Sequence, residues 1–217
     1  TLFRSLPIER RLKLSTYQVT TLYAAILKDA SFRVPMFAGC LTGAALFCYI
    51  SSASAVFMGQ YGLSQQQFSY AFAFNAAGIM LMSSLNKHLN TRMDIYPRLR
   101  LGGSIQFLGA VCVVFAGSMH NAPLWILMSG LFFVVSGIGL TGPNAMALAM
   151  PKQGARAGTA SAIMGSMQFA CGLLGGVILN FLIWKASLNM GLMMLMFTSA
   201  GLVAIFKVGR QQNSISM

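Results

Sequence analysis

Long apolar runs without charged residues alternate with short polar segments along most of the chain. About 20 apolar residues, each rising about 1.5 Å along a helix, cross the hydrocarbon core of a bilayer, so each run predicts a transmembrane helix. Six such runs follow one another, at residues 34–57, 68–85, 101–119, 124–150, 157–184 and 188–206. The pattern therefore predicts an all-α membrane protein in which residues 34–207 form a bundle of six transmembrane helices.

The segment that precedes the first run is basic and polar. Within it, five apolar residues recur at helical spacing: Val19, Leu22, Tyr23, Ile26 and Leu27. This spacing predicts a short amphipathic helix that lies on the membrane surface. We expect residues 31–35 to turn the chain into the bilayer, and we interpret residues 1–33 as a linker and residues 208–217 as a tail. Further on, Ser64 is expected to be the N-cap of the second transmembrane helix.

The fourth and fifth runs carry small and polar residues as well as apolar ones. In the fourth run these residues lie near and past the middle: Gly137, Gly139, Thr141, Gly142, Pro143 and Asn144. In the fifth run they share one face of a helix: Ser161, Gly165, Gln168, Gly172 and Gly175. Small residues let helix backbones approach closely in lipid, and buried amides need partners. We interpret this pair of helices as part of the wall of a membrane pore or cavity.

The composition and the placement of charge agree with a membrane protein. The chain is 56% hydrophobic and 8% charged, whereas a soluble domain has about 25% charged residues. Its net charge of +12 would fit a nucleic-acid partner, but the basic residues alternate between loops. Six precede residue 34, four follow the second run, two follow the fourth and two follow the sixth, while Lys185 lies on the opposite side. Cytoplasmic loops collect Lys and Arg, so both termini are expected to be cytoplasmic and no nucleic acid is expected.

The four cysteines and the methionine cluster are interpreted as packing residues. Cys40, Cys48, Cys112 and Cys171 all lie in apolar runs without a Cys-x-x-Cys pair or a nearby His. This arrangement favours small buried thiols over a disulfide or a metal site. The methionines of the sixth run are interpreted as adaptable packing in the same way: Met190, Met193, Met194 and Met196.

Four polar residues within the runs are candidates for binding a substrate: Tyr49, Asn75, Asn144 and Gln168. Polar groups at membrane depth tend to mark functional sites, so pocket lining is favoured for Asn75, with a bond to a neighbouring helix as the alternative. Three neighbours would add adaptable apolar surface: Phe72, Phe74 and Met164. Such a site would accept varied amphipathic ligands rather than one charged metabolite.

Four stretches of the chain are similar to a known family: Leu27-Lys28-Asp29-Ala30-Ser31-Phe32, Gly62-Leu63-Ser64-Gln65-Gln66-Gln67-Phe68, Phe72-Ala73-Phe74-Asn75-Ala76, and Ala157-Gly158-Thr159-Ala160-Ser161-Ala162 with Gln168-Phe169. They resemble the Bcr/CflA subfamily of major facilitator drug/proton antiporters. The resemblance covers nearly the whole chain, as the C-terminal six-helix half of a protein built from two such halves. Because the chain begins at Thr1 without a signal-peptide pattern, we expect it to be a piece of a longer protein.

The resemblance implies the function and the orientation of the helices. It implies multidrug efflux of small amphipathic molecules across the bacterial inner membrane, driven by the proton gradient and without a cofactor. It also implies that the first, second, fourth and fifth helices line a central cavity, while the third and sixth face lipid. The resemblance implies that residues 85–94 take the place of half of the cytoplasmic gating motif of the family, with Asp94 as its acidic position. The stretch departs from that motif, which starts with Gly and spaces its acid and arginines more regularly, so a solvated basic loop is the alternative.

The acidic residues set a limit on what this chain does alone. Glu9, Asp29 and Asp94 are its acids, and all lie outside the apolar runs. Without a base beside a nucleophile at membrane depth, an enzyme is not expected. The resemblance places the proton-coupling carboxylates in the N-terminal half. The alternative is a truncated, non-transporting remnant or a membrane scaffold, and a homodimer of halves is a further possibility.

Overall fold

The computed structural model describes residues 16–215, with side chains described for residues 20–154 and 156–209. The N-terminal part of the predicted linker, with Arg4, Glu9, Arg10, Arg11 and Lys13, lies outside the described residues. The elements in chain order are α1 (Thr16–Lys28), α2 (Ala30–Ser54), the π-helical turn η2 (Ala55–Gln60), α3 (Gln65–Leu89), α4 (Ile95–Ser118), α5 (Leu124–Ser136), α6 (Ile138–Ala149), the 3-10 turn η3 (Gly154–Arg156), α7 (Ala157–Leu179) and α8 (Ala186–Ile215).

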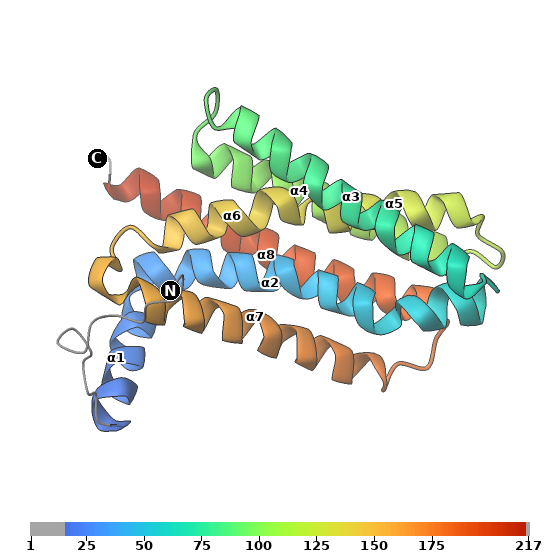
Figure 1. Ribbon diagram of the computed structural model, residues 1–217, viewed down its shortest axis with the longest axis horizontal. Helices are drawn as coiled ribbons and strands as arrows, with labels where there is room; N and C mark the ends of the chain where they lie inside the picture. The colour runs from blue at the N-terminus through green and yellow to red at the C-terminus, as the bar shows by residue number, and fades with distance from the viewer. Residues whose placement is uncertain (1–15, 216–217) are drawn as a thin grey trace, which may run out of the picture.

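The helices from α2 to α8 run side by side along the long axis of the molecule, and α1 lies across one end (Figure 1). Six helices among the described residues are long and apolar enough to cross a membrane, with α5 and α6 together making the fourth. The predicted all-α membrane architecture with six spans is therefore confirmed.

The observed helix ends differ from the expected ones by several residues. α2 begins at Ala30 and contains Pro35, so the chain turns at Asp29 rather than over residues 31–35. Asp29 is the N-cap, and its carboxylate accepts hydrogen bonds from the Ser31 backbone N–H at 2.9 Å and from the Ser31 hydroxyl at 2.7 Å. α8 continues as a helix to Ile215, into the segment interpreted as a tail. Capping groups decide these ends, and hydropathy does not report them.

The expected N-cap at Ser64 is present. The Ser64 hydroxyl accepts a hydrogen bond from the Gln67 N–H, and the Gln67 side chain accepts one from the Ser64 N–H at 2.9 Å. This reciprocal pair is a capping box, which satisfies two N–H groups that the first turn of α3 would leave unbonded. α3 therefore begins at Gln65, three residues before the apolar run.

The fourth span is broken at Gly137 into α5 and α6. A Cβ at Gly137 would overlap Cγ of Gln106 on α4, so any larger residue at this position would force Gln106 to move. The Gln106 side chain is fully buried, and its Nε2 donates to the Thr42 carbonyl of α2 at 3.3 Å and to the Val134 carbonyl of α5 at 3.1 Å. One amide thus joins three helices beside the break.

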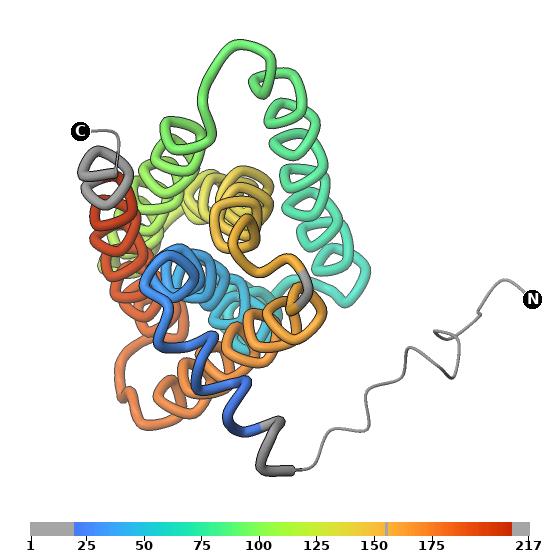
Figure 2. The backbone as a smooth tube through the Cα atoms, turned by 90° about the vertical axis from the view of Figure 1, so that its left-hand side faces the viewer, coloured from blue at the N-terminus to red at the C-terminus, as the bar shows by residue number. Residues whose placement is uncertain are grey.

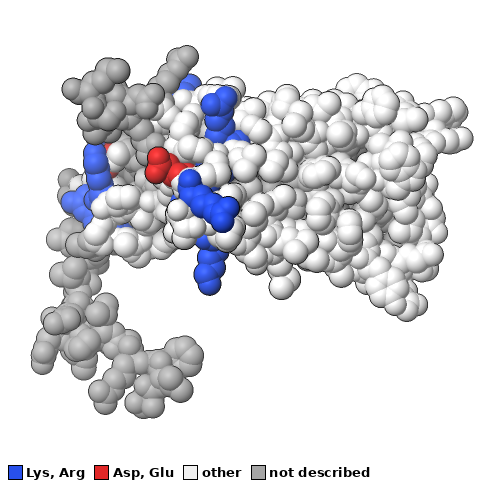
Figure 3. Space-filling view, turned by 90° about the horizontal axis from the view of Figure 1, so that it is seen from above, with Lys and Arg blue, Asp and Glu red and all other residues white. Residues whose placement is uncertain are grey.

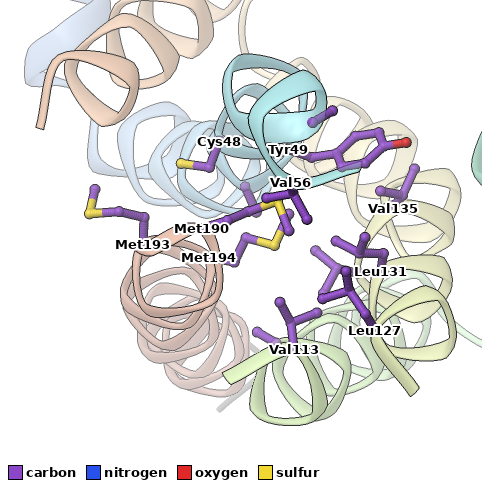
Figure 4. Packing of buried hydrophobic residues seen from close by; sticks show 14 of the residues in the cluster. Cys48, Tyr49, Val56, Val113, Leu127, Leu131, Val135, Met190, Met193 and Met194 are labelled. Atoms are coloured by element: carbon purple, nitrogen blue, oxygen red, sulfur yellow. The ribbon is translucent and has the colours of Figure 1, made fainter. Parts of the chain in front are cut away.

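The main apolar core lies between α2, α4, α5 and α8. Figure 4 shows residues of these helices pointing towards one another, among them Val113, Leu131 and Met194. Met190, Met193 and Met194 are buried here, as their interpretation as packing residues requires, while Met196 is exposed. The prediction of four buried thiols is wrong for Cys112, which is exposed, and holds only in part for Cys171, which is half-buried, whereas Cys40 and Cys48 are buried. A thiol on an apolar surface is stable in lipid, so the run alone could not tell its face.

α2 is the central helix of the bundle, and α3 and α7 lie at its edge (Figure 2). Each span has a most apolar 18-residue stretch, of which 61% is buried in the first span, 11% in α3 and 22% in α7. Large apolar side chains are exposed on α3, such as Tyr70, Phe74, Met80 and Leu81, and on α7, such as Phe169, Leu173, Leu174 and Val177. α4 and α8, which the resemblance places towards lipid, each bury one face and expose the other.

Candidate binding cavity and its polar surroundings

A cavity of about 580 Å³ lies between α2, α6 and α7. Four sulfur-containing residues line it: Cys40, Met146, Met150 and Met164. The polar lining residues are Ser161 and Gln168, and the remainder are glycine, alanine and proline. The lining therefore carries no charged side chain, and its soft thioethers can adapt to ligands of different shape.

Glycine creates the space in this cavity. Gly142 and Gly165 line it from α6 and α7, and a Cβ at either position would meet nothing within 4 Å. Farther along α7 the glycines allow close helix contact instead, because a Cβ at Gly172 would overlap the Phe47 ring and one at Gly175 would lie 2.8 Å from the Phe197 ring. The predicted small-residue face of α7 thus divides into a part that opens a cavity and a part that packs against neighbours.

Gln168 is the one predicted site residue that lines this cavity. Its side chain is half-buried and lies over Gly43 of α2, where a Cβ would come within 2.5 Å of Nε2. Within the described part of the chain its amide has no hydrogen-bond partner.

The structure brings Tyr49 and Asn75 together, but inside the bundle. The Asn75 Nδ2 donates to the Tyr49 hydroxyl oxygen at 3.1 Å, and the Tyr49 ring stacks on Phe72 at 5.1 Å. Tyr49 is 1% and Asn75 0% exposed, so both belong to the core between α2 and α3. The Asn75 Oδ1 has no partner among the described residues. This pair lies apart from the residues that line the cavity with Gln168.

Asn144 belongs to a third place, a buried polar network near the basic end. Its Nδ2 donates to the Asn86 Oδ1 at 2.9 Å and to the Leu140 carbonyl at 2.7 Å. The Asn86 Oδ1 also accepts from Nη1 of Arg98 at 3.1 Å. Asp94, the acidic position of the expected gating motif, is the N-cap of α4 without a side-chain capping bond. The four predicted residues are therefore divided among three sites.

Sequence reasoning missed Met146, Met150, Asn86 and Arg98. A signal for the first two was present, because Gly142, Met146 and Met150 repeat every four residues and so share one face of α6. Asn86 and Arg98 lay in a segment that was interpreted as a loop, and the extension of α3 and α4 beyond the apolar runs brings them into the bundle. Among the described residues, no group of three His, Cys, Asp or Glu side chains could hold a metal ion.

The linker helix α1 packs beside the cavity at the basic end. Ile26 of α1 is buried in a cluster that includes Ile163 and Met164 of α7. The Gln153 Nε2, from the link between α6 and α7, donates to the Asp29 Oδ2 at 3.1 Å. Hydrogen bonds from Ser31, with smaller contributions from Lys152 and Gln153, hold the pKa of Asp29 below its usual value of 3.8 against a partial desolvation that raises it.

Comparison with known proteins places this geometry in a family. A model of the Major Facilitator Superfamily matches residues 4–178, most of the chain. The chain belongs to the Major Facilitator Superfamily. Its members are transporters rather than enzymes, and this chain is a multi-pass membrane protein. The family inferred from the resemblance is thereby confirmed.

Two curated members of the superfamily show how much of a transporter the chain represents. It is 29% identical over 168 residues to the "Bicyclomycin resistance protein homolog" of Haemophilus influenzae. The aligned region covers 77% of this chain and 42% of that protein. It is also 29% identical over 211 residues to the "Uncharacterized MFS-type transporter YdgK" of Bacillus subtilis. Here the aligned region covers 96% of this chain and 51% of that protein. The chain spans about half the length of these relatives.

Proposed function

We propose that this chain is the C-terminal half of a drug/proton antiporter that exports small amphipathic molecules across the bacterial inner membrane. The observation that carries the proposal is the uncharged, methionine-lined cavity between α2, α6 and α7. Its volume of about 580 Å³ is typical of sites for small organic ligands. The name of one relative, a bicyclomycin resistance protein homolog, supports drug export as the activity.

The lining supports a broad class of substrate. Three thioethers can repack around apolar rings, while the Gln168 amide and the Ser161 hydroxyl offer neutral hydrogen bonds. Moving a strongly charged metabolite out of water costs free energy, and a site without charged side chains does not offset this cost. Uncharged or weakly charged amphipathic compounds are therefore favoured. The apolar flanks on α3 and α7 are proposed to contact the other half, around which alternating access would rock.

Protons are proposed to be coupled outside this half. The six spans contain no Asp or Glu, since Asp29 and Asp94 lie just before α2 and α4 and Glu9 lies outside the described residues. A proton-coupling group has to titrate at membrane depth, so the carboxylate is proposed to lie in the N-terminal half. The Lys and Arg side chains gather at one end of the molecule in Figure 3, and we propose that this end faces the cytoplasm.

The test measures export by the intact transporter that contains this chain. Cells are loaded with a fluorescent amphipathic dye, and its export is followed with and without a protonophore. We expect Gly165→Leu to lower the export rate about tenfold, because the new side chain fills the cavity without a clash at Cβ. Gly158→Leu is the matched control, since Gly158 also has open space but does not line the cavity.

Three outcomes would contradict the proposal. An equal loss of export rate in the two leucine variants would show that the cavity does not take part in transport. Export that resists the protonophore would remove proton coupling. Absence of export by the unmodified protein, at normal abundance in the membrane, would favour the alternative of a non-transporting scaffold.

A further inference from the structure

Arg98 is a buried cation whose hydrogen-bond partners are all neutral. It lies in the first turn of α4 and is 6% exposed. Its guanidinium donates to the Asp94 carbonyl at 3.3 Å, the Asn86 carbonyl at 3.4 Å, the Asn86 Oδ1 at 3.1 Å and the Asn90 Oδ1 at 2.7 Å. These four oxygens fix the plane of the guanidinium, but none of them carries a full negative charge.

Among the residues whose side chains the structure describes, no carboxylate forms an ion pair with this guanidinium, so its buried charge is not neutralised there. Burying an ion away from water is costly, and neutral amides compensate less of that cost than a carboxylate or a phosphate does. Four oxygens occupy most of the five N–H donors of an arginine and hold them in a fixed fork. The site therefore holds positive charge in place and leaves the counter-charge to another molecule.

A cavity of about 360 Å³ offers that molecule a place. It lies between α3, α4 and α6, and its lining includes Asn86, Lys87, Asn90, Ile95, Arg98 and Asn144. Two of these side chains are cationic and three are amides, and the acidic Asp94 is not among the lining residues. The lining is thus positive, in contrast to the uncharged cavity beside α7.

The N-terminus of α4 adds to the same potential. Ile95, its first residue, lines the cavity, and the Asp94 side chain makes no capping bond there. Backbone N–H groups at a helix N-terminus carry partial positive charge and favour anions, phosphate in particular. Buried guanidinium, exposed ammonium and helix terminus converge on one cavity, which makes a phosphate group the best-matched occupant.

We propose that this cavity binds a phosphate group, supplied either by the headgroup of an anionic lipid or by a free phosphate. The cavity lies at the end of the bundle where Lys and Arg side chains gather (Figure 3). Ends of membrane spans lie at the level of the lipid phosphates, so the first source is within reach of the cavity. The second source is the aqueous phase beyond the same end. This inference does not rest on the transport activity.

The test uses the purified, delipidated, intact protein in a zwitterionic detergent. Its Tm is measured against rising inorganic phosphate at constant ionic strength, and separately against rising anionic phospholipid, with zwitterionic lipid as reference. We expect one of these ligands to raise the Tm of the unmodified protein in a saturable way. Lys87→Gln should weaken the apparent affinity about fivefold, the effect of one charge contact in a watery site.

Matched variants separate the site from general charge. Arg100 is an exposed cation two residues from Arg98, and it lies over the Phe206 ring at 4.9 Å, outside the cavity. The Arg100→Gln variant should therefore keep the ligand affinity of the unmodified protein. Arg98→Gln should abolish the ligand-dependent rise, and Lys87→Gln keeps the test valid if that variant fails to fold. A rise with lipid alone identifies a headgroup site, and a rise with inorganic phosphate, with or without a rise with lipid, identifies a site for the free phosphate group.

The proposal is overturned by either of two results. One is a Tm that responds to neither ligand. The other is a response that Lys87→Gln and Arg100→Gln reduce equally, because it would report the net charge of the basic end and no built site.

Discussion

α2 and α7 are about equally apolar, yet they occupy opposite kinds of place in the molecule. Of their most apolar stretches, 61% is buried in the span of α2 and 22% in α7. α2 lies at the centre, where it contacts α8, α7, α6 and α5, whereas α7 packs its glycine face on α2 and leaves the opposite face exposed. Apolarity does not sort helices in a membrane, because lipid tails accept an apolar side chain as readily as a protein core does. The small and polar residues of each helix decide its position instead.

The first test of this contrast places a methyl group at a tight helix contact inside the bundle and another at an open position of α7. Gly109 of α4 lies against α5, where a Cβ would come within 2.8 Å of the Gly130 oxygen and of the Val134 nitrogen. Backbone atoms cannot yield as a side chain can, so we expect Gly109→Ala to lower the free energy of unfolding by about 3 kcal/mol. Unfolding in detergent, followed by Tm and by denaturant titration, measures the loss.

Gly165→Ala on α7 is the matched control, because its Cβ would meet nothing within 4 Å. Its effect should stay within about 0.5 kcal/mol, with the helix propensity of alanine as a small gain. Similar losses in the two variants would contradict the division into a contact region and an open region.

The second test concerns the buried polar pair of α2 and α3. Tyr49→Phe removes the hydroxyl that accepts from Asn75 and leaves the whole Asn75 amide without a partner among the described residues. We expect a loss of about 1 kcal/mol, because an unpaired amide is costly but buried hydrogen bonds in membrane proteins average below that value. Combining Tyr49→Phe with Asn75→Leu should restore part of the loss, whereas simple additivity in this double-mutant cycle would show that the pair does not interact.

The third and smallest effect concerns α1 at the basic end of α7. The Asp29 pKa is lowered, so its carboxylate stabilises the folded form above the usual pKa of 3.8, and this contribution is lost as the pH falls through the lower, folded pKa. Hydrogen exchange of the α1 amides, corrected for intrinsic rates, should therefore show protection that declines below about pH 3.8. Asp29→Asn keeps the shape and removes the titration, so a decline of the same size in that variant would assign it to another group.

Much of the fold could be predicted from the sequence, and the candidate site could be predicted in part. The six spans and the Ser64 cap follow from local patterns, because helix period, span length and capping chemistry act over a few residues. Gln168 lines a cavity together with Ser161 and Gly165, with which it shares a helix face. Whether it binds a substrate stays a prediction.

The other candidates show where local patterns stop. Tyr49, Asn75 and Asn144 were selected as polar residues at membrane depth, and this criterion does not say whether a side chain faces a cavity or a neighbour. Asn75 is hydrogen-bonded to Tyr49, 26 residues away in the chain, and Asn144 is hydrogen-bonded to Asn86, 58 residues away. Such partners depend on how helices rotate and cross, which small residues at distant positions determine together.

By itself, the sequence determined that the chain crosses a membrane six times, which end is basic and where α3 begins. These properties depend on the length of apolar runs, on the order of charges and on one capping box, and each is complete within a short segment. The tertiary structure alone decided that α2 is central, that the methionine-lined cavity opens beside Gln168, and that Arg98 is buried among neutral oxygens. Each of these properties needs side chains from several helices, so the packing of the whole bundle sets it.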